Sequence, residues 1–189
     1  AGEWVEIQGY LGNDLFAAGQ DVVLDGQVGD DAFLAGRSVS FRGEVADMLM
    51  AAGESVLVDG LADGDVCVAG RTLHLTEDVW IGGRLFAAGA QVRVEGSTIG
   101  GSTRVAAGSV YLDGQFNGPV EIYSNDVTFG EEFQATGVTR IHSNRELNRN
   151  ELGNAPENLI IEVEQKSGFL AAGLFYLWYL LSLLVTGLI

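Results

Sequence analysis

The strongest constraint on the fold is a short repeat that runs through most of the chain. The segment FAAG at residues 16–19 returns as FLAG at residues 33–36. The glycine that ends each such segment recurs at intervals of 17 to 19 residues, as Gly19, Gly36, Gly53, Gly70, Gly89 and Gly108. A regular period of this size is typical of solenoids, in which each repeat is one folded unit that packs against its neighbours.

Each repeat contains alternating residues that predict short β-strands. An apolar-x-apolar triplet follows each glycine, and its outer members share one face because side chains alternate along a strand. The triplets are VEI, VVL, VSF, VLV, LHL, VRV, VYL and VTF, which begin at residues 5, 22, 39, 56, 73, 92, 110 and 127. Their middle members are chemically mixed, which is typical of positions that face solvent.

Two further strands are predicted in each repeat. One contains the glycine-ended segments, with the bulky column Phe16, Phe33, Met50, Cys67, Phe86, Val105 and Ile122. The other contributes the column Leu11, Val28, Val45, Ala62, Val79, Ile99, Phe116 and Phe133. We therefore predict an all-β fold: a parallel β-helix with three short strands in each coil of 17–19 residues. About eight coils would give a rod roughly 38 Å long at about 4.8 Å per step.

The glycine-ended strand has two apolar faces, so its orientation decides which residues are accessible. If the column that begins with Phe16 points inward, the opposite face is an exposed apolar wall. Such a wall would be a partner surface, with Leu15, Leu34, Leu49, Val66, Val68 and Leu85 as its candidate residues. Two alternatives stay open: the facing is inverted, or the segment after residue 144 covers the wall.

The periodic AAG-x-x-V-x-V-x-G pattern over residues 5–141 resembles the bactofilins, the polymer-forming cytoskeletal proteins of bacteria. This resemblance implies a right-handed β-helix. It transfers no catalytic or ligand-binding residue. Exported, membrane-anchored members of the wider family have the repeat domain followed by apolar spans, as this chain does, whereas the cytoplasmic members are soluble.

The end of the chain predicts a membrane anchor. Residues 168–189 form a run of 22 residues without a charged side chain, which as a helix would be roughly 33 Å long and would span a bilayer. Phe175, Tyr176, Trp178 and Tyr179 lie near its middle and are candidate contacts to another helix. We predict a β-helix domain at 1–143, a capping segment and linker at 144–167, and a transmembrane helix at 168–189. The start AGEW suits a processed secretory protein, and we expect the natural chain to continue past Ile189.

Composition and charge exclude several functions. A net charge of -16 argues against nucleic acid, because phosphate contacts need a basic face. Cys67 is the single cysteine, so the chain cannot form an internal disulfide. The two histidines, His74 and His142, cannot supply a three-histidine zinc site, and we interpret both as surface or cap residues. Aspartate pairs such as Asp30 and Asp31 are interpreted as turn residues.

We predict no catalytic residue, no cofactor and no metal. The resulting hypothesis is a non-enzymatic, membrane-anchored subunit of the bacterial inner membrane. Its β-helix would be periplasmic and would dock on a larger membrane protein assembly, with photosynthetic and respiratory assemblies as candidates. The alternative is a self-polymerising scaffold like the bactofilins. A carbohydrate-acting β-helix enzyme is the third class, and it would require clustered carboxylates in a groove.

Overall fold

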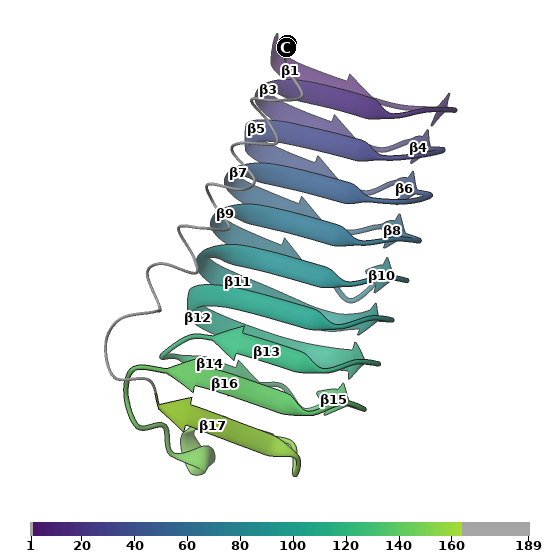
Figure 1. Ribbon diagram of the computed structural model, residues 1–189. Coiled ribbons are helices and arrows are strands. Elements are labelled where there is room, and N and C mark those ends of the chain that lie inside the picture. Colours follow the sequence, from purple (N-terminus) through teal and green to yellow (C-terminus); the bar gives the residue numbers. More distant parts are fainter. Residues whose placement is uncertain (1, 164–189) are drawn as a thin grey trace.

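The computed structural model describes residues 2–163 and shows a parallel β-solenoid of about ten turns. In Figure 1 the turns lie one above another, from β1 in purple at one end to β17 in yellow-green at the other. The paired strands are parallel, and each lies next to its counterpart in the adjacent turn. The predicted parallel repeat fold is thus confirmed. It is longer than the eight coils expected, because β16 and β17 continue it beyond the last triplet.

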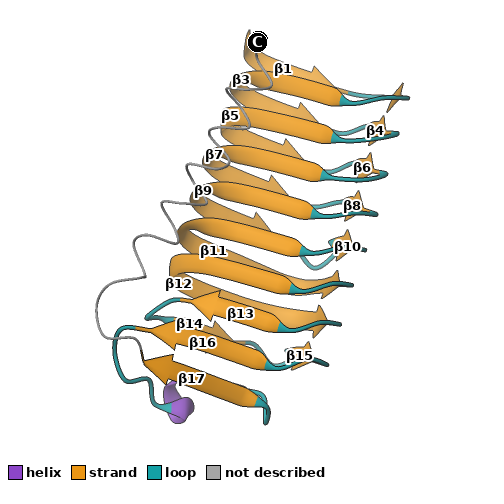
Figure 2. Ribbon diagram, viewed as in Figure 1, coloured by secondary structure: helices purple, strands orange, loops and turns teal. Residues whose placement is uncertain are grey.

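The strands form two groups, which Figure 2 shows as broad and narrow orange arrows. The longer ones are β1 (Gly2–Ile7), β3 (Leu15–Leu24), β5 (Ala32–Phe41), β7 (Leu49–Val58), β9 (Val66–Leu75), β11 (Leu85–Ile99), β12 (Thr103–Phe116), β13 (Val120–Tyr123), β14 (Val127–Phe129), β16 (Thr139–Ser143) and β17 (Leu159–Val163). The two-residue strands are β2 (Tyr10–Leu11), β4 (Gln27–Val28), β6 (Glu44–Val45), β8 (Leu61–Ala62), β10 (Trp80–Ile81) and β15 (Gln134–Ala135). Within residues 2–163, the one helical segment is the 3-10 turn η1 (Arg149–Glu151).

In β3, β5, β7 and β9, two of the three predicted strands of a coil are one continuous strand; β11 and β12 also include the third, whereas β13 and β14 remain separate. β3, for example, contains both the FAAG segment, which ends at Gly19, and the VVL triplet. A side chain is excluded at this point from β3 to β11, whereas Ala107 occupies the position in β12. A Cβ on Gly36 would lie 2.9 Å from the Gly19 carbonyl oxygen, and one on Gly53 would lie 2.7 Å from the Gly36 carbonyl oxygen. Glycine therefore allows the parallel pairing to continue through the bend, since successive backbones approach closely there.

The core is a set of apolar columns that run the length of the solenoid. The outer members of the triplets are buried as predicted, including Val22, Leu24, Val39 and Phe41. The register is regular: Val22 pairs with Val39, and Val39 pairs with Val56. Stacking of equivalent side chains thus converts a 17-residue sequence period into one continuous hydrophobic core.

The third predicted column is correct in the early turns and shifts later. Ala62 pairs with Ile81, where the sequence suggested Val79, and Phe116 pairs with Ala135, where it suggested Phe133. The longer repeats contain extra turn residues before these strands, which moves the pairing by two positions. The displaced residues stay in the core, and the Phe133 ring contacts the Phe129 ring with 4.5 Å between centroids.

The two ends of the described solenoid differ. At the C-terminal end, the Phe129 amide donates to the Leu152 carbonyl oxygen at 2.8 Å, and β17 pairs with β16. Leu152 is buried, so this segment covers part of the last turn. At the other end, Val5, Ile7 and Leu15 are half-buried, and Leu11 is exposed. Among residues 2–163, no further strand pairs with β1 on its outer side.

A search of residues 2–163 finds no helix that is both long and apolar enough to cross a membrane. The predicted span at 168–189 lies outside the described residues. The same holds for its candidate contacts Phe175, Tyr176, Trp178 and Tyr179.

Candidate interaction surface

The apolar wall predicted as a partner surface is part of the core, so the predicted facing was wrong. Leu34, Leu49, Val66, Val68 and Leu85 are at most 2% exposed, and Leu15 is half-buried in the first turn. The alternative of an inverted facing is the correct one. A sequence signal for it exists: Leu15 and Ala17 are followed by Ala32 and Leu34, and then by Leu49 and Ala51. Each of these three turns thus contributes one large and one small side chain, and the fourth contributes two of middle size, Val66 and Val68, which keeps the core volume nearly constant.

The face that points outward has a bulky column beside a small one. We call the bulky column the ridge, formed by Phe16, Phe33, Met50, Cys67 and Phe86. We call the small column the shelf, formed by Ala18, Ala35, Ala52, Ala69 and Ala88. Each ridge residue pairs with the ridge residue of the next turn, and each shelf residue pairs with the shelf residue of the next turn. The surface is therefore one apolar stripe over five consecutive turns.

The ridge is accessible to solvent despite its apolar character. Phe16 is 64% exposed, and Phe33, Met50, Cys67 and Phe86 are partly exposed. The Phe16 and Phe33 rings are stacked with 4.5 Å between centroids, and the Arg84 guanidinium carbon lies 5.3 Å from the centroid of the Phe86 ring. A contiguous apolar stripe on a protein of net charge -16 is the kind of surface that marks an interaction site.

The stripe ends where the same face becomes charged. Phe86 pairs with Arg104, and Arg104 pairs with Glu121, so Val105 and Ile122 lie in the core and not in the bulky column as predicted. Arg104 forms an ion pair with Glu121 at 2.6 Å. The interval from Phe86 to Arg104 is 18 residues, whereas the preceding intervals along this column are 17 or 19, and a change of one position reverses the facing of a strand.

The charged part of the face has its own side-chain network. The Tyr123 hydroxyl donates to Glu121 Oε1 at 2.9 Å, and the rings of Tyr123 and His142 are stacked at 4.4 Å. His142 lies between Glu121 and Glu162, 3.3 Å from each carboxylate. Desolvation opposes ionisation of Glu121, but hydrogen bonds from Tyr123 and Arg104 outweigh it and lower the pKa of Glu121. This network joins β13, β16 and β17 where the solenoid ends.

One edge of the stripe is lined by carboxylates that support the backbone. Asp31 Oδ1 accepts from the Met48 amide at 3.0 Å, and Asp65 Oδ1 accepts from the Arg84 amide at 2.7 Å. The side-chain hydrogen bond from Arg84, followed by its backbone hydrogen bond and charge, lowers the pKa of Asp65 although desolvation opposes this. Burial, and then the Asp65 carboxylate, raise the pKa of the neighbouring Cys67 thiol to about 11.

The other edge of the stripe carries alternating charges at the glycine bend. Arg37 and Arg71 lie in the turns on either side of Glu54, at 3.2 Å and 3.8 Å from its carboxylate. All three side chains are at least half exposed. They line an open groove of about 710 Å³ together with small polar residues such as Ser38 and Thr72. The stripe thus lies between an edge that carries the carboxylates of Asp31 and Asp65 with the Arg84 guanidinium, and an edge that carries Arg37, Glu54 and Arg71.

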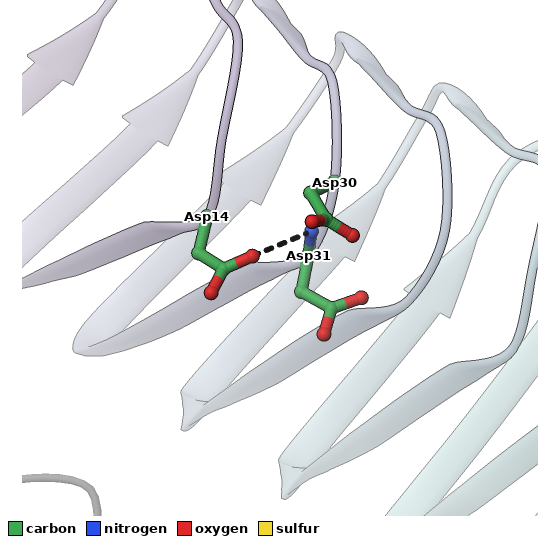
Figure 3. Close-up of side chains that lie close together, drawn as sticks. All are labelled: Asp14, Asp30 and Asp31. Carbon is green, nitrogen blue, oxygen red and sulfur yellow. Dashed lines mark hydrogen bonds between the residues drawn. The ribbon is translucent and has the colours of Figure 1, made fainter.

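Three aspartates of the first two turns lie close together, as Figure 3 shows. The carboxylates of Asp14, Asp30 and Asp31 lie within 4.8 Å of one another. The Asp14 carboxylate, followed by desolvation and then by Asp31 and Asp47, raises the pKa of Asp30. Asp14 Oδ1 accepts from the Asp31 amide at 3.4 Å, just as Asp31 accepts from Met48. These contacts explain Asp14 and Asp31 as turn residues that extend the backbone pairing.

Other acidic side chains follow a second corner of the solenoid. An open groove of about 680 Å³ is lined by Asp25, Glu44, Asp59 and Asp78, with Arg42 between them. Asp59 accepts from the Thr76 hydroxyl, and Glu44 accepts from the Gln27 amide at 2.9 Å. His74 is 2.5 Å from Glu95 on a neighbouring turn. These contacts link successive turns and thus have a structural explanation.

Searches against protein-family models, curated proteins and solved structures return no match to this chain.

Proposed function

We propose that the protein is a non-enzymatic structural or accessory subunit that attaches to a larger assembly of the bacterial inner membrane. The observation that carries this proposal is the partly exposed apolar stripe of ridge and shelf, in which Ala69 alone is buried, on an otherwise acidic rod. Burial of this stripe against a partner would remove apolar surface from water, at about 25 cal/mol for each Å². The acidic remainder would keep the subunit soluble outside the contact.

The solenoid suits this role because it presents side chains at fixed intervals. Neighbouring turns are paired along almost their whole length, and parallel strands lie about 4.8 Å apart. A partner that meets the ridge therefore finds an ordered surface, with little side-chain entropy to lose around the stacked Phe16 and Phe33 rings. Preorganisation of this kind favours specific binding.

The proposed membrane location rests on the sequence. A helix formed by the charge-free residues 168–189 would hold the solenoid at the bilayer surface. The resemblance to exported bactofilin-like proteins supports a periplasmic solenoid. We propose no bound cofactor or metal, and no nucleic-acid partner. Photosynthetic and respiratory assemblies are the candidate classes of partner.

Purification of the full chain from its native membranes in mild detergent tests the proposal. We expect a second protein to co-purify at a fixed ratio, and Phe33→Glu in the ridge to abolish this. Thr128→Glu is the matched control, since Thr128 is exposed on a different column. Recovery of the chain without any other protein would refute attachment to a larger assembly.

The alternative function is self-polymerisation, and the open first turn favours it. β1 has one free edge among the described strands, and Val5, Ile7 and Leu15 of the core column are only half-buried there. An uncovered end of a β-solenoid can accept a further rung from another molecule. Electron microscopy of the full chain in detergent would show filaments if the ends join, and uniform single particles if they do not.

A further inference from the structure

The ridge and the shelf are complementary to each other, which points to a second copy of the chain as a partner. In each of five turns the ridge residue and the alanine are two positions apart on the same outward face, as are Phe33 and Ala35; four of the alanines are accessible, and Ala69 is 4% exposed. A second solenoid can face the first with parallel rod axes and reversed strand directions. Each bulky side chain then lies over an alanine of the other copy, and this occurs in all five turns at once.

We propose that two copies form a parallel dimer through this surface, with a two-fold axis along the rods. This inference rests on the proposed role of the stripe as a contact surface and names its first partner. The larger assembly would then bind the pair, and Phe33→Glu would prevent that binding by separating the two copies. The arrangement is isologous, since the ridge of each copy meets the shelf of the other, as a closed two-fold dimer requires.

The charges at the edges of the stripe agree with this arrangement. The symmetry axis passes over the column that contains Leu34. A position three residues before this column in one copy therefore faces the position three residues after it in the other copy. Asp31 would lie opposite Arg37 of the second copy, and in the fourth turn Asp65 would lie opposite Arg71. The remaining opposed pairs of the five turns contain at most one charge each. No like charges are therefore opposed at these edges, which favours the pairing.

An antiparallel dimer centred on the same five turns would be poorly matched. The ridge would meet the ridge, so that Phe16 would lie against Phe86, and the shelf would meet the shelf across a gap. Arg37 would face Arg71, and Glu54 would face its own copy. Repulsion between like charges and the poorly filled interface both disfavour this orientation.

The size of the surface predicts a dimer that is weak in solution. Five turns at about 4.8 Å and seven residues at about 3.3 Å give roughly 550 Å² per copy, or about 1,100 Å² in total. This is near the lower limit for specific interfaces. A parallel pair places both copies of Val163 at the same end, so two anchored chains could pair while held by one membrane. Confinement of this kind raises the effective concentration and favours association.

Distance measurements between spin labels test the orientation. The full chain in nanodiscs would carry Cys67→Ser with one added cysteine, either Gln20→Cys near the first turn or Asn144→Cys near the last. Both native side chains are exposed. The parallel dimer predicts a distance of roughly 20–25 Å for each label, from the strand and sheet spacings. An antiparallel dimer places at least one label pair much farther apart, whatever its register, and that result would overturn the proposal.

Shelf variants test whether the proposed surface makes the dimer. Ala52→Glu is expected to weaken dimerisation at least tenfold, whereas Ala46→Glu, on an exposed position of another side, should leave it unchanged. Far-ultraviolet circular dichroism would verify that both variants retain the β-solenoid. Absence of any short distance between labels would refute the dimer. If another protein still co-purified through Phe33, the proposed attachment to a larger assembly would stand without the dimer.

Discussion

The Phe16 ring stacks on the Phe33 ring of the next turn, with 4.5 Å between the centroids and an interplanar angle of 2°. Both rings lie on the outer face of the solenoid, where Phe16 is 64% exposed. Their stacking stabilises the surface of successive turns, while the residues on either side of them in the sequence fill the core. This arrangement separates the residues that hold the fold from those that are available for contacts.

The two faces of one strand should therefore respond differently to truncation. We expect Leu49→Ala to lower the free energy of unfolding by about 2–5 kcal/mol, because Leu49 is fully buried. Met50→Ala, the adjacent ridge residue, should cost less than about 1 kcal/mol, since Met50 is partly exposed. Urea denaturation of the two variants measures the difference, and equal losses would contradict the facing described above.

The glycine bend should not tolerate a side chain. A Cβ at position 53 would lie 2.7 Å from the Gly36 carbonyl oxygen, so we expect Gly53→Ala to lower stability by more than about 1 kcal/mol. Gly12→Ala is the control, because its Cβ would meet its nearest atom, Tyr10 Cε1, at 3.7 Å. Thermal unfolding would compare the two. A larger effect at position 12 than at position 53 would show that close backbone approach does not explain the repeated glycines.

The Cys67 thiol should react slowly with alkylating reagents. Its pKa is raised to about 11, so little thiolate is present at pH 8, and the reaction rate should rise with pH up to that value. Asp65→Asn removes a negative charge and should speed alkylation at pH 8. Arg84→Gln removes the opposing positive charge and should slow it. Rates of iodoacetamide labelling in dilute protein provide the measurement, and a faster reaction of the Arg84→Gln variant would contradict this account.

The Glu121 network should contribute stability that depends on pH. The folded-state pKa of Glu121 is lowered, so its contribution is present above the ordinary carboxyl pKa of 4.5 and is lost as pH falls through the folded-state value. In the Glu121→Gln variant, the free energy of unfolding should therefore fall less steeply with decreasing pH below about pH 4.5. Glu131→Gln changes an exposed glutamate outside this network and serves as the control. Urea midpoints between pH 3 and 6 would reveal a steeper acid loss in the control than in Glu121→Gln.

The parallel solenoid could be predicted from the period alone, whereas the candidate surface could not. Val39 and Phe41 alternate with Ser38, Ser40 and Arg42, so their inward facing was evident from the sequence and is confirmed. Phe16 and Leu15 are both apolar, as are most of their counterparts, so alternation leaves two equivalent orientations for that strand. The bulky column was assigned to the core, but the core instead accommodates the alternating leucine and alanine side chains, and the aromatic rings lie outside.

The sequence by itself determined the repeat, its glycine bends and the columns of the triplets, because these depend on local alternation and on spacing along the chain. Only the tertiary structure decided which side of the FAAG strand is accessible and where the apolar stripe ends. The first depends on the volume that the strands of each turn enclose. The second depends on the spacing between Phe86 and Arg104, which changes the facing of residues that the period alone would align. Both are properties of neighbouring turns in contact, and no single repeat contains them.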